Sequence, residues 1–170
     1  MMSTLEIELA LYDYFRNGYL FLIPNVSYGF LKYEADMLTV SNSGYLSEIE
    51  IKRSRSDFLA DFKKKHFHDD DRIKYKYYAI SSELYNEVKD LFDKEETKKF
   101  GIFICEKRQH KYWTKEKGYY YETVYRAGLK RKPKAFCKTP LSQKDIIKLA
   151  SLMCYRIFSN KLKEAKNGEK

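Results

Sequence analysis

The chain lacks several patterns that would define its class directly. Its three cysteines, Cys105, Cys137 and Cys154, are far apart and form no CxxC pair, so neither a zinc site nor an iron–sulfur site is supported. An odd cysteine count without a framework suits a reducing compartment. The first residues show no basic segment followed by an apolar one, as a secretory signal would, and no apolar run approaches the ~20 residues that span a bilayer. We therefore expect a soluble, cytoplasmic protein without membrane association.

Glycine-rich loops and nucleophile groupings are missing as well. The seven glycines are scattered, which argues against a glycine-rich phosphate-binding loop. No Ser/His/Asp grouping is visible. His66 and His68 lie in the polar segment HFHDDD at 66–71, where we expect a loop, and no second cluster completes a metal site there.

Charge and tyrosine are present in excess. A chain of 170 residues that is 44% hydrophobic can form one domain with a sizeable core. Its formal net charge of +9 favours a polyanionic partner such as nucleic acid, although solubility alone would also account for it. The 16 tyrosines suit strands and cores as well as base stacking.

Hydrophobic periodicity and turn signals predict an α/β domain over residues 1–160, with a mixed central β-sheet flanked by helices. Ser3 and Glu6 form a capping box before a helix that we expect to end near Gly18. The expected sheet begins with an antiparallel hairpin and continues with crossover strands. We expect helices at 4–16, 57–65, 82–92 and 142–158, and strands at 19–26, 31–40, 45–53, 75–81 and 100–106.

Three further segments are predicted from composition. Residues 111–125 are rich in aromatic side chains around a Lys117–Gly118 turn, which indicates a second hairpin. Residues 126–134 (RAGLKRKPK) read as a basic loop. The polar residues 161–170 read as a disordered tail.

The strand EIEIK at 48–52 raises the main functional question. Strand side chains alternate between faces, so Glu48, Glu50 and Lys52 share one face. A turn near residues 42–44 places Asp36 opposite Glu50, within a residue or two, at a cross-strand distance of ~5 Å. Either this face is solvated, or its charges hold a ligand.

Two converging carboxylates would suit Mg²⁺, which keeps several waters and binds phosphate. Asp36 and Glu50 are the candidate metal ligands, and the backbone carbonyl of Ile51 is a third. Lys52 could position an attacking water or stabilise developing charge. Glu48 lies one step further away, as an outer ligand or a solvated residue.

The spacing of Asp36, Glu50 and Lys52, D-(x13)-E-x-K, resembles that of the PD-(D/E)XK nuclease superfamily. The continuation EIKRSRSDFLADFK and the later YYAI are similar to the MmcB-like branch of DNA-repair-type nucleases. The resemblance spans about residues 4–158 and is sharp over 34–81, although Ala35 stands where the family pattern has proline. It implies a restriction-endonuclease-like core, DNA as the partner, and phosphodiester hydrolysis that depends on Mg²⁺, with Mn²⁺ as a substitute. The implied catalytic residues are Asp36, Glu50 and Lys52.

Many members of this superfamily also use a glutamate from the first helix. Glu8 is our choice because it lies beside Leu11 and Phe15, at the edge of the apolar side of that helix. Glu6 is the rival, and an ordinary solvated Glu8 is the alternative.

Two groups of basic residues could follow a DNA backbone. One group comes directly after Lys52 in the chain, and the other lies in the expected basic loop at 126–134. For the loop residues, simple exposure to solvent is an equal alternative. Tyr119, Tyr120 and Tyr121 could stack on unpaired bases, or pack as edge-strand residues. The expected DNA-binding residues are Arg53, Arg55, Lys63, Lys64, Arg126, Lys130, Arg131 and Lys132.

Three functions remain open at this level. The first is a DNA endonuclease or exonuclease in repair, recombination or phage DNA processing. The second is a nuclease-fold protein that binds DNA or a repair partner without cleaving. The third is an assembly protein whose EIEIK face is merely solvated. A homodimer is compatible with the tyrosine-rich strands but is not required by them.

Overall fold

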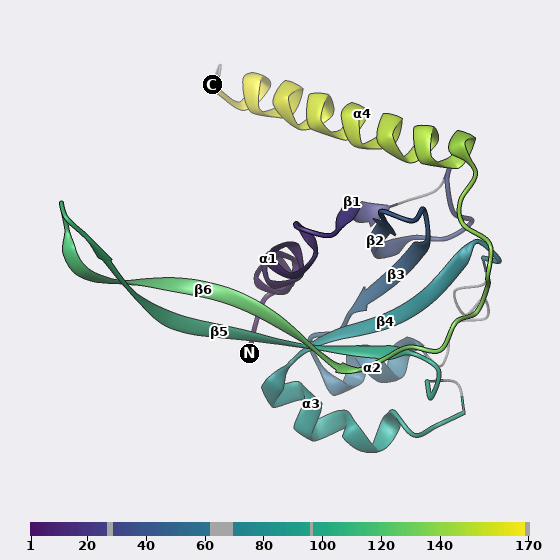
Figure 1. Ribbon diagram of the computed structural model, residues 1–170, viewed down its shortest axis with the longest axis horizontal. Helices are drawn as coiled ribbons and strands as arrows, with labels where there is room; N and C mark the ends of the chain where they lie inside the picture. Colours follow the sequence, from purple (N-terminus) through teal and green to yellow (C-terminus); the bar gives the residue numbers. More distant parts are fainter. Residues whose placement is uncertain (27–28, 62–69, 96, 169–170) are drawn as a thin grey trace.

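The computed structural model describes residues 1–26, 29–61, 70–95 and 97–168. It shows a mixed six-stranded sheet flanked by helices (Figure 1). The elements in chain order are α1 (Thr4–Phe15), β1 (Tyr19–Val26), β2 (Ala35–Ser41), β3 (Leu46–Ile51), α2 (Arg55–Asp61), β4 (Ile73–Ser81), α3 (Ser82–Val88), the 3₁₀ turn η1 (Lys89–Leu91), β5 (Gly101–Thr114), β6 (Gly118–Arg131) and α4 (Gln143–Gly168).

The spatial order of the strands follows their order in the chain, from β1 to β6. Strands β1, β2 and β3 are antiparallel, β3, β4 and β5 are parallel, and β6 returns antiparallel to β5. Parallel neighbours need a crossover connection, and α2 and α3 lie within the two crossovers. The prediction of a mixed sheet, with an antiparallel hairpin followed by crossover strands, is confirmed.

Helix α1 covers one face of the sheet. Its capping box is confirmed, since the Ser3 hydroxyl accepts from the Glu6 amide and the Glu6 carboxylate accepts from the Ser3 amide. The helical spacing of Ile7, Leu11 and Phe15 places all three on one side, where they are buried. They pack against residues of the central strands and β5, including Met37, Ile49, Ile51, Ala79 and Phe103.

The other face of the sheet is divided between two groups of helices. Leu149 of α4 packs with Leu38 and Leu46. Phe58 of α2 packs with Tyr78 of β4 and with residues of α3. The alternation within EIEIK therefore points its isoleucines toward α1 and its charged residues toward the face shared by α2, α3 and α4.

Two predicted segment boundaries are wrong because the chain continues its regular structure through polar sequence. The expected strand at 100–106 and the expected hairpin at 111–125 form one long hairpin, with register unbroken from Phe103↔Leu129 to Thr114↔Gly118. Most of the expected basic loop at 126–134 therefore lies in β6. Helix α4 continues to Gly168 instead of ending near residue 158, since Lys, Leu, Glu and Ala are strong helix formers. Residues 161–168 of the expected tail are therefore helical, and the last two lie outside the described residues.

Smaller differences bear on the candidate site. Strand β2 begins at Ala35, not at residue 31, so Tyr33 lies in the preceding loop. Helix α2 is described up to Asp61, and the rest of the segment expected to be helical lies outside the described residues, as does most of HFHDDD. No helix within the described ranges is long and apolar enough to cross a membrane.

Candidate functional site

The register of the β2–β3 hairpin brings the predicted acidic residues into apposition. Met37 pairs with Ile49, and Leu38 pairs with Glu48. The next step in this register places Asp36 opposite Glu50. The turn that sets the register contains Gly44 at φ +77°, a left-handed conformation that glycine adopts without strain.

Asp36 is fixed against the backbone of β3. Its Oδ2 accepts a hydrogen bond of 2.8 Å from the Ile51 amide. In an extended strand the N–H and C=O groups of one residue point to the same side. The Ile51 carbonyl, the predicted third ligand, therefore also lies on the side of β3 that faces Asp36.

Lys52 lies between two carboxylates. Its Nζ donates to Oε2 of Glu50 at 2.8 Å and to Oδ1 of Asp61 at 2.9 Å. All three residues are buried, with exposed fractions of 3%, 3% and 1% for Lys52, Glu50 and Asp61. Burial alone would lower the pKa of Lys52, but the charges of Glu50 and Asp61 outweigh it and raise the pKa above its usual value. The two carboxylates therefore favour the ammonium form of Lys52.

Asp61 belongs to this cluster, although it was not among the predicted site residues. It lies three residues after Phe58 on α2, so the two share one helix face, and both are buried. The sequence signal for a buried Asp61 was a carboxylate on the same helix face as an apolar residue. Its partner, Lys52, could not be identified from α2 alone.

Glu48 is also buried, so the proposal of a solvated EIEIK face is wrong. Its exposed fraction is 1%, and the Tyr33 hydroxyl donates to its Oε2 at 3.0 Å. Burial raises the pKa of Tyr33, and the Glu48 charge raises it further, so Tyr33 remains a donor. The neighbouring position on β4 is the buried Lys76. Glu48 is thus held by Tyr33 in the loop before β2.

Replacing Tyr33 with phenylalanine tests this hydrogen bond. Removing one partner of a buried carboxylate costs about 1–3 kcal/mol, so we expect the free energy of unfolding in urea to fall by that amount. Tyr12→Phe is the matched control because Tyr12 is exposed on α1, and it should change stability little. Equal effects of the two substitutions would contradict a role for Tyr33 in holding Glu48.

The structure separates the two candidate glutamates of α1. Glu6 accepts from Lys107 at 2.8 Å and caps the helix at Ser3, and these bonds lower its pKa to about 2. Glu8 has a raised pKa, first because it is partly buried and second because the Asp36 charge lies nearby. Glu8 is therefore the glutamate whose charge interacts with that of Asp36, and Glu6 has a structural role.

The opposite pKa shifts of Glu8 and Glu6 predict opposite effects on stability. Folding favours the protonated form of Glu8. Its contribution to the free energy of unfolding is therefore fully present below the ordinary pKa of 4.5, and it is lost as pH rises through the higher pKa of the folded state. Glu8→Gln should therefore raise the free energy of unfolding at pH 7 and not at pH 4. Glu6→Gln should lower it at pH 7, because the contribution of Glu6 is present above 4.5 and is lost toward pH 2. Denaturant titrations at several pH values check both signs, and a loss of stability for both variants at pH 7 would contradict this assignment.

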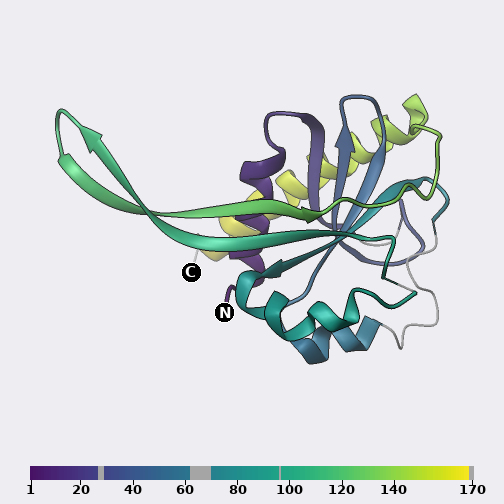
Figure 2. The same ribbon diagram turned by 60° about the horizontal axis from the view of Figure 1, so that its bottom comes forward.

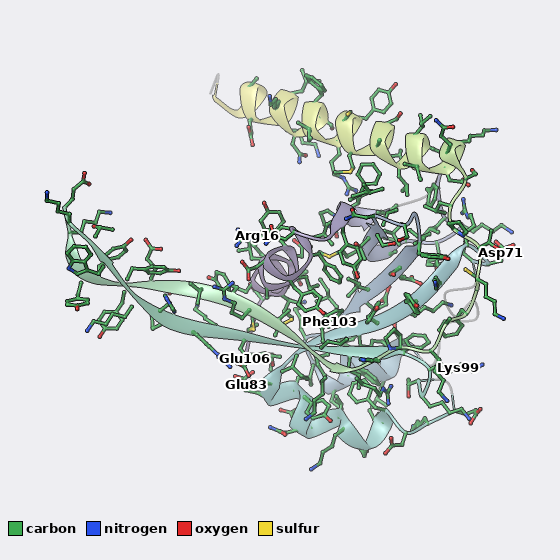
Figure 3. The ribbon with its side chains drawn as sticks, in the orientation of Figure 1. Arg16, Asp71, Glu83, Lys99, Phe103 and Glu106 are labelled. Carbon is green, nitrogen blue, oxygen red and sulfur yellow. The ribbon has the colours of Figure 1, made fainter. Side chains whose placement is uncertain are left out.

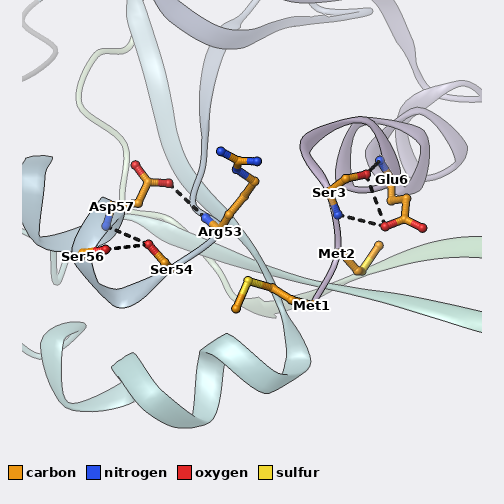
Figure 4. Close-up of a pocket in the computed structure, with 8 residues that line it drawn as sticks. All are labelled: Met1, Met2, Ser3, Glu6, Arg53, Ser54, Ser56 and Asp57. Carbon is orange, nitrogen blue, oxygen red and sulfur yellow. Dashed lines mark hydrogen bonds between the residues drawn. The ribbon is translucent and has the colours of Figure 1, made fainter.

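Of the predicted DNA-binding residues near the site, Arg53 remains available to a ligand. It is exposed and lines a pocket of about 680 Å³ between the start of α1 and the start of α2 (Figure 4). Arg55 instead makes a two-pronged contact with Asp90, at 3.2 Å for each nitrogen. Lys63 and Lys64 lie outside the described residues.

The predicted basic residues of β6 have mixed surroundings. Arg131 donates to the backbone carbonyls of Phe100, Phe92 and Thr97, so its guanidinium is occupied in holding the turn before β5. Arg126 pairs with Asp13 of α1, and Lys130 lies 5.8 Å from the centre of the Tyr85 ring. Lys132 is exposed. The structure does not bring this group together with Arg53.

Asp36 and Glu50 are the two carboxylates that the sequence predicts as ligands of Mg²⁺. Among the described residues, no three His, Cys, Asp or Glu side chains lie close enough to hold a metal by themselves. Mg²⁺ usually takes one or two carboxylates, several waters and the phosphates of its substrate. Asp36 and Glu50 would be such a pair, and the Asp36 charge contributes to the raised pKa of Glu8 after the larger effect of burial.

Comparisons with known proteins support the fold but carry no function. No protein-family model matches the chain, and no curated protein matches it. A solved structure of a protein of unknown function from Silicibacter pomeroyi is similar, with a TM-score of 0.62 at 16% identity. The match covers 95% of this chain and 92% of that one, so the similarity extends over nearly the whole architecture.

Proposed function

We propose that this protein is a Mg²⁺-dependent deoxyribonuclease that hydrolyses phosphodiester bonds at Asp36, Glu50 and Lys52. One observation carries the proposal. Asp36 follows the hairpin register opposite Glu50, its carboxylate binds the amide of Ile51, and the Lys52 ammonium binds Glu50. These are the three residues of the D-(x13)-E-x-K spacing, and that spacing resembles the one in PD-(D/E)XK nucleases.

The fold agrees with what that resemblance implies. A restriction-endonuclease-like core would have a mixed sheet that begins with antiparallel strands and continues through a crossover, with helices on both faces. The order from α1 to β4, with β3 and β4 parallel around α2, has this form. A cytoplasmic role in DNA repair, recombination or phage DNA processing is the corresponding cellular proposal, and three free cysteines support it.

Each residue has a distinct part in the proposed reaction. Asp36, Glu50 and the Ile51 carbonyl would hold the metal, which when bound supplies charge neutralisation at the phosphate and a more acidic water. Lys52, as an ammonium ion, would stabilise negative charge that develops on the phosphate oxygens. Asp61 holds Lys52 in place from α2 and is a positioning residue. Arg53, next in the chain, lines the pocket beside the start of α1 and would attract the DNA backbone there.

A nuclease-fold protein that binds DNA without cleavage is the second candidate, and one observation favours it. Lys52 and Glu50 are both nearly fully buried and bonded to each other, so the cluster also has the character of a structural ion pair. If the protein has that function, its affinity for DNA should fall as the salt concentration rises, and Glu50→Gln should leave the affinity unchanged.

A cleavage panel distinguishes the two candidates. Single-stranded, duplex, nicked and branched DNA are incubated with purified protein in Mg²⁺, Mn²⁺ or EDTA. We expect cleavage in either metal, none in EDTA, and none by Glu50→Gln. DNA binding without cleavage of any of the four substrates would instead favour the second candidate.

A further inference from the structure

The β5–β6 hairpin extends far beyond the rest of the sheet as an arm, defined here as residues 107–125. Both ribbon views show it projecting away from the other elements (Figures 1 and 2). Glu106, labelled in Figure 3, lies where the hairpin leaves the packed sheet. The last buried residue of β5 is Cys105, and of the arm's side chains Tyr125, at its base, packs against the core beneath α1.

The base of the arm is fixed to the helix that carries Glu8. Lys107 pairs with Glu6 at 2.8 Å, and Arg126, directly after the arm, pairs with Asp13. Glu6 and Asp13 both belong to α1. The direction of the arm is therefore set relative to α1, the helix that also carries Glu8.

One face of the arm presents aromatic rings to solvent. The register pairs Trp113 with Tyr119 and Lys111 with Tyr121, so these four side chains share a face. The three aromatic residues have exposed fractions between 62% and 70%, and the Lys111 ammonium lies 4.1 Å from the centre of the Tyr119 ring. We call these four residues the aromatic face.

The opposite face of the arm behaves differently. The rings of His110 and Tyr112 are 4.5 Å apart, and those of Tyr112 and Tyr120 are stacked at 5.7 Å. Tyr112 and Tyr120 are therefore partly covered by each other. The rings of that face stabilise the hairpin itself, whereas the rings of the aromatic face have a large area left for a ligand.

The chemistry of the aromatic face favours nucleic acid over a lipid surface or an apolar protein groove. Its rings are tryptophan and tyrosine, each with a polar group, and it presents no Leu, Ile, Val, Met or Phe. The arm carries five Lys or Arg residues against two Glu, which suits a polyanion. Tyr119 and Tyr121 are two residues apart, about 7 Å along the strand, so successive unpaired bases could each meet a ring.

We propose that the aromatic face binds single-stranded DNA, with Trp113, Tyr119 and Tyr121 stacking on unpaired bases and Lys111 contacting phosphate. Stacking on aromatic side chains tolerates any base sequence. The arm thus serves as a substrate-holding element for single-stranded or unwound DNA. The choice of DNA rests on the proposed nuclease function, whereas the stacking itself follows from the arm alone.

Trp113 is the sole tryptophan of the chain, so its fluorescence reports on the arm directly. A 20-nucleotide oligothymidylate is titrated into wild-type protein in EDTA, where metal-dependent cleavage cannot occur. We expect Trp113 emission to be quenched with the same midpoint as the fluorescence anisotropy of labelled oligonucleotide. Duplex DNA of equal length should bind more weakly.

Alanine substitutions complete the test. Tyr119→Ala and Tyr121→Ala should each weaken oligothymidylate binding by roughly 5- to 100-fold, and Lys111→Ala should reduce the dependence of log affinity on log salt by about 0.7. Tyr155→Ala is the control because Tyr155 is 75% exposed on α4, away from the arm. It should leave the affinity unchanged.

Several outcomes would overturn the role of the arm. These are binding that leaves Trp113 emission unchanged, binding insensitive to the tyrosine substitutions, and equal binding to vesicles of anionic phospholipid. Failure of the nuclease proposal would look different, as binding through Trp113 without cleavage of any substrate. If the protein cleaves DNA but Tyr119→Ala and Tyr121→Ala bind it normally, the nuclease proposal stands and the proposed role of the arm is wrong.

Discussion

Asp36→Asn should reduce Mg²⁺-dependent DNA cleavage by about 100- to 1,000-fold, the effect expected when one group that stabilises transition-state charge is removed. The substitution keeps the size of the side chain and an oxygen that can accept from the Ile51 amide, a bond of 2.8 Å in the wild type. It removes the negative charge that would attract the metal. The fold should therefore remain intact while the metal affinity falls.

The measurement is initial cleavage rate as a function of Mg²⁺ concentration, with circular dichroism to verify folding. Asp93→Asn is the matched control because Asp93 is exposed in the loop after η1. It should cleave at the wild-type rate. Cleavage by Asp36→Asn within about threefold of the wild type, a difference of roughly 0.7 kcal/mol, would place the reaction elsewhere.

Lys52→Met should lower the free energy of unfolding by about 3–5 kcal/mol, because removal of one partner leaves uncompensated buried charge. The carboxylates of Glu50 and Asp61 both contact the ammonium, and neither is exposed. The triple variant Lys52→Met, Glu50→Gln, Asp61→Asn removes all three charges together. It should recover much of the lost stability, since neutral replacement of a whole buried ion cluster is often tolerated.

Urea denaturation of the four proteins, wild type, single variant, triple variant and a control, tests this pattern. Lys148→Met is the control because Lys148 is exposed on α4, and its effect should be small. The stable triple variant should still fail to cleave DNA, because it lacks both the Glu50 carboxylate and the Lys52 ammonium of the proposed site. A Lys52→Met protein as stable as the wild type would contradict the buried cluster.

Local patterns in the sequence were enough to predict the part of the site that lies on neighbouring strands. The alternation within EIEIK and a turn containing Gly44 determine which residues of β2 and β3 face each other, and both are short-range features. The capping box at Ser3 and the Ser142 hydroxyl, which accepts from the Asp145 amide, mark two helix starts for the same reason. Asp36 opposite Glu50 follows from these signals without any knowledge of the rest of the fold.

The remaining features depend on contacts between segments far apart in the chain. Asp61 joins the site only because α2 packs over β3, and Arg131 is occupied only because the end of β6 meets the carbonyls around Phe92 and Phe100. The arm was misjudged because its polar residues suggested a break in the strand, whereas the cross-strand hydrogen bonds continue without a core beneath them. Composition over a few residues contains no information on such partners.

The most direct test of the central claim is a crystal structure of the protein soaked in Mn²⁺, with anomalous diffraction used to locate the ion. The proposed function predicts an anomalous peak coordinated by Asp36, Glu50 and the Ile51 carbonyl, at about 2.0–2.3 Å, the range for oxygen ligands of small divalent cations. The peak should vanish in Asp36→Asn. Mn²⁺ bound at another cluster, or no peak from a protein that cleaves DNA under the same conditions, would contradict the claim.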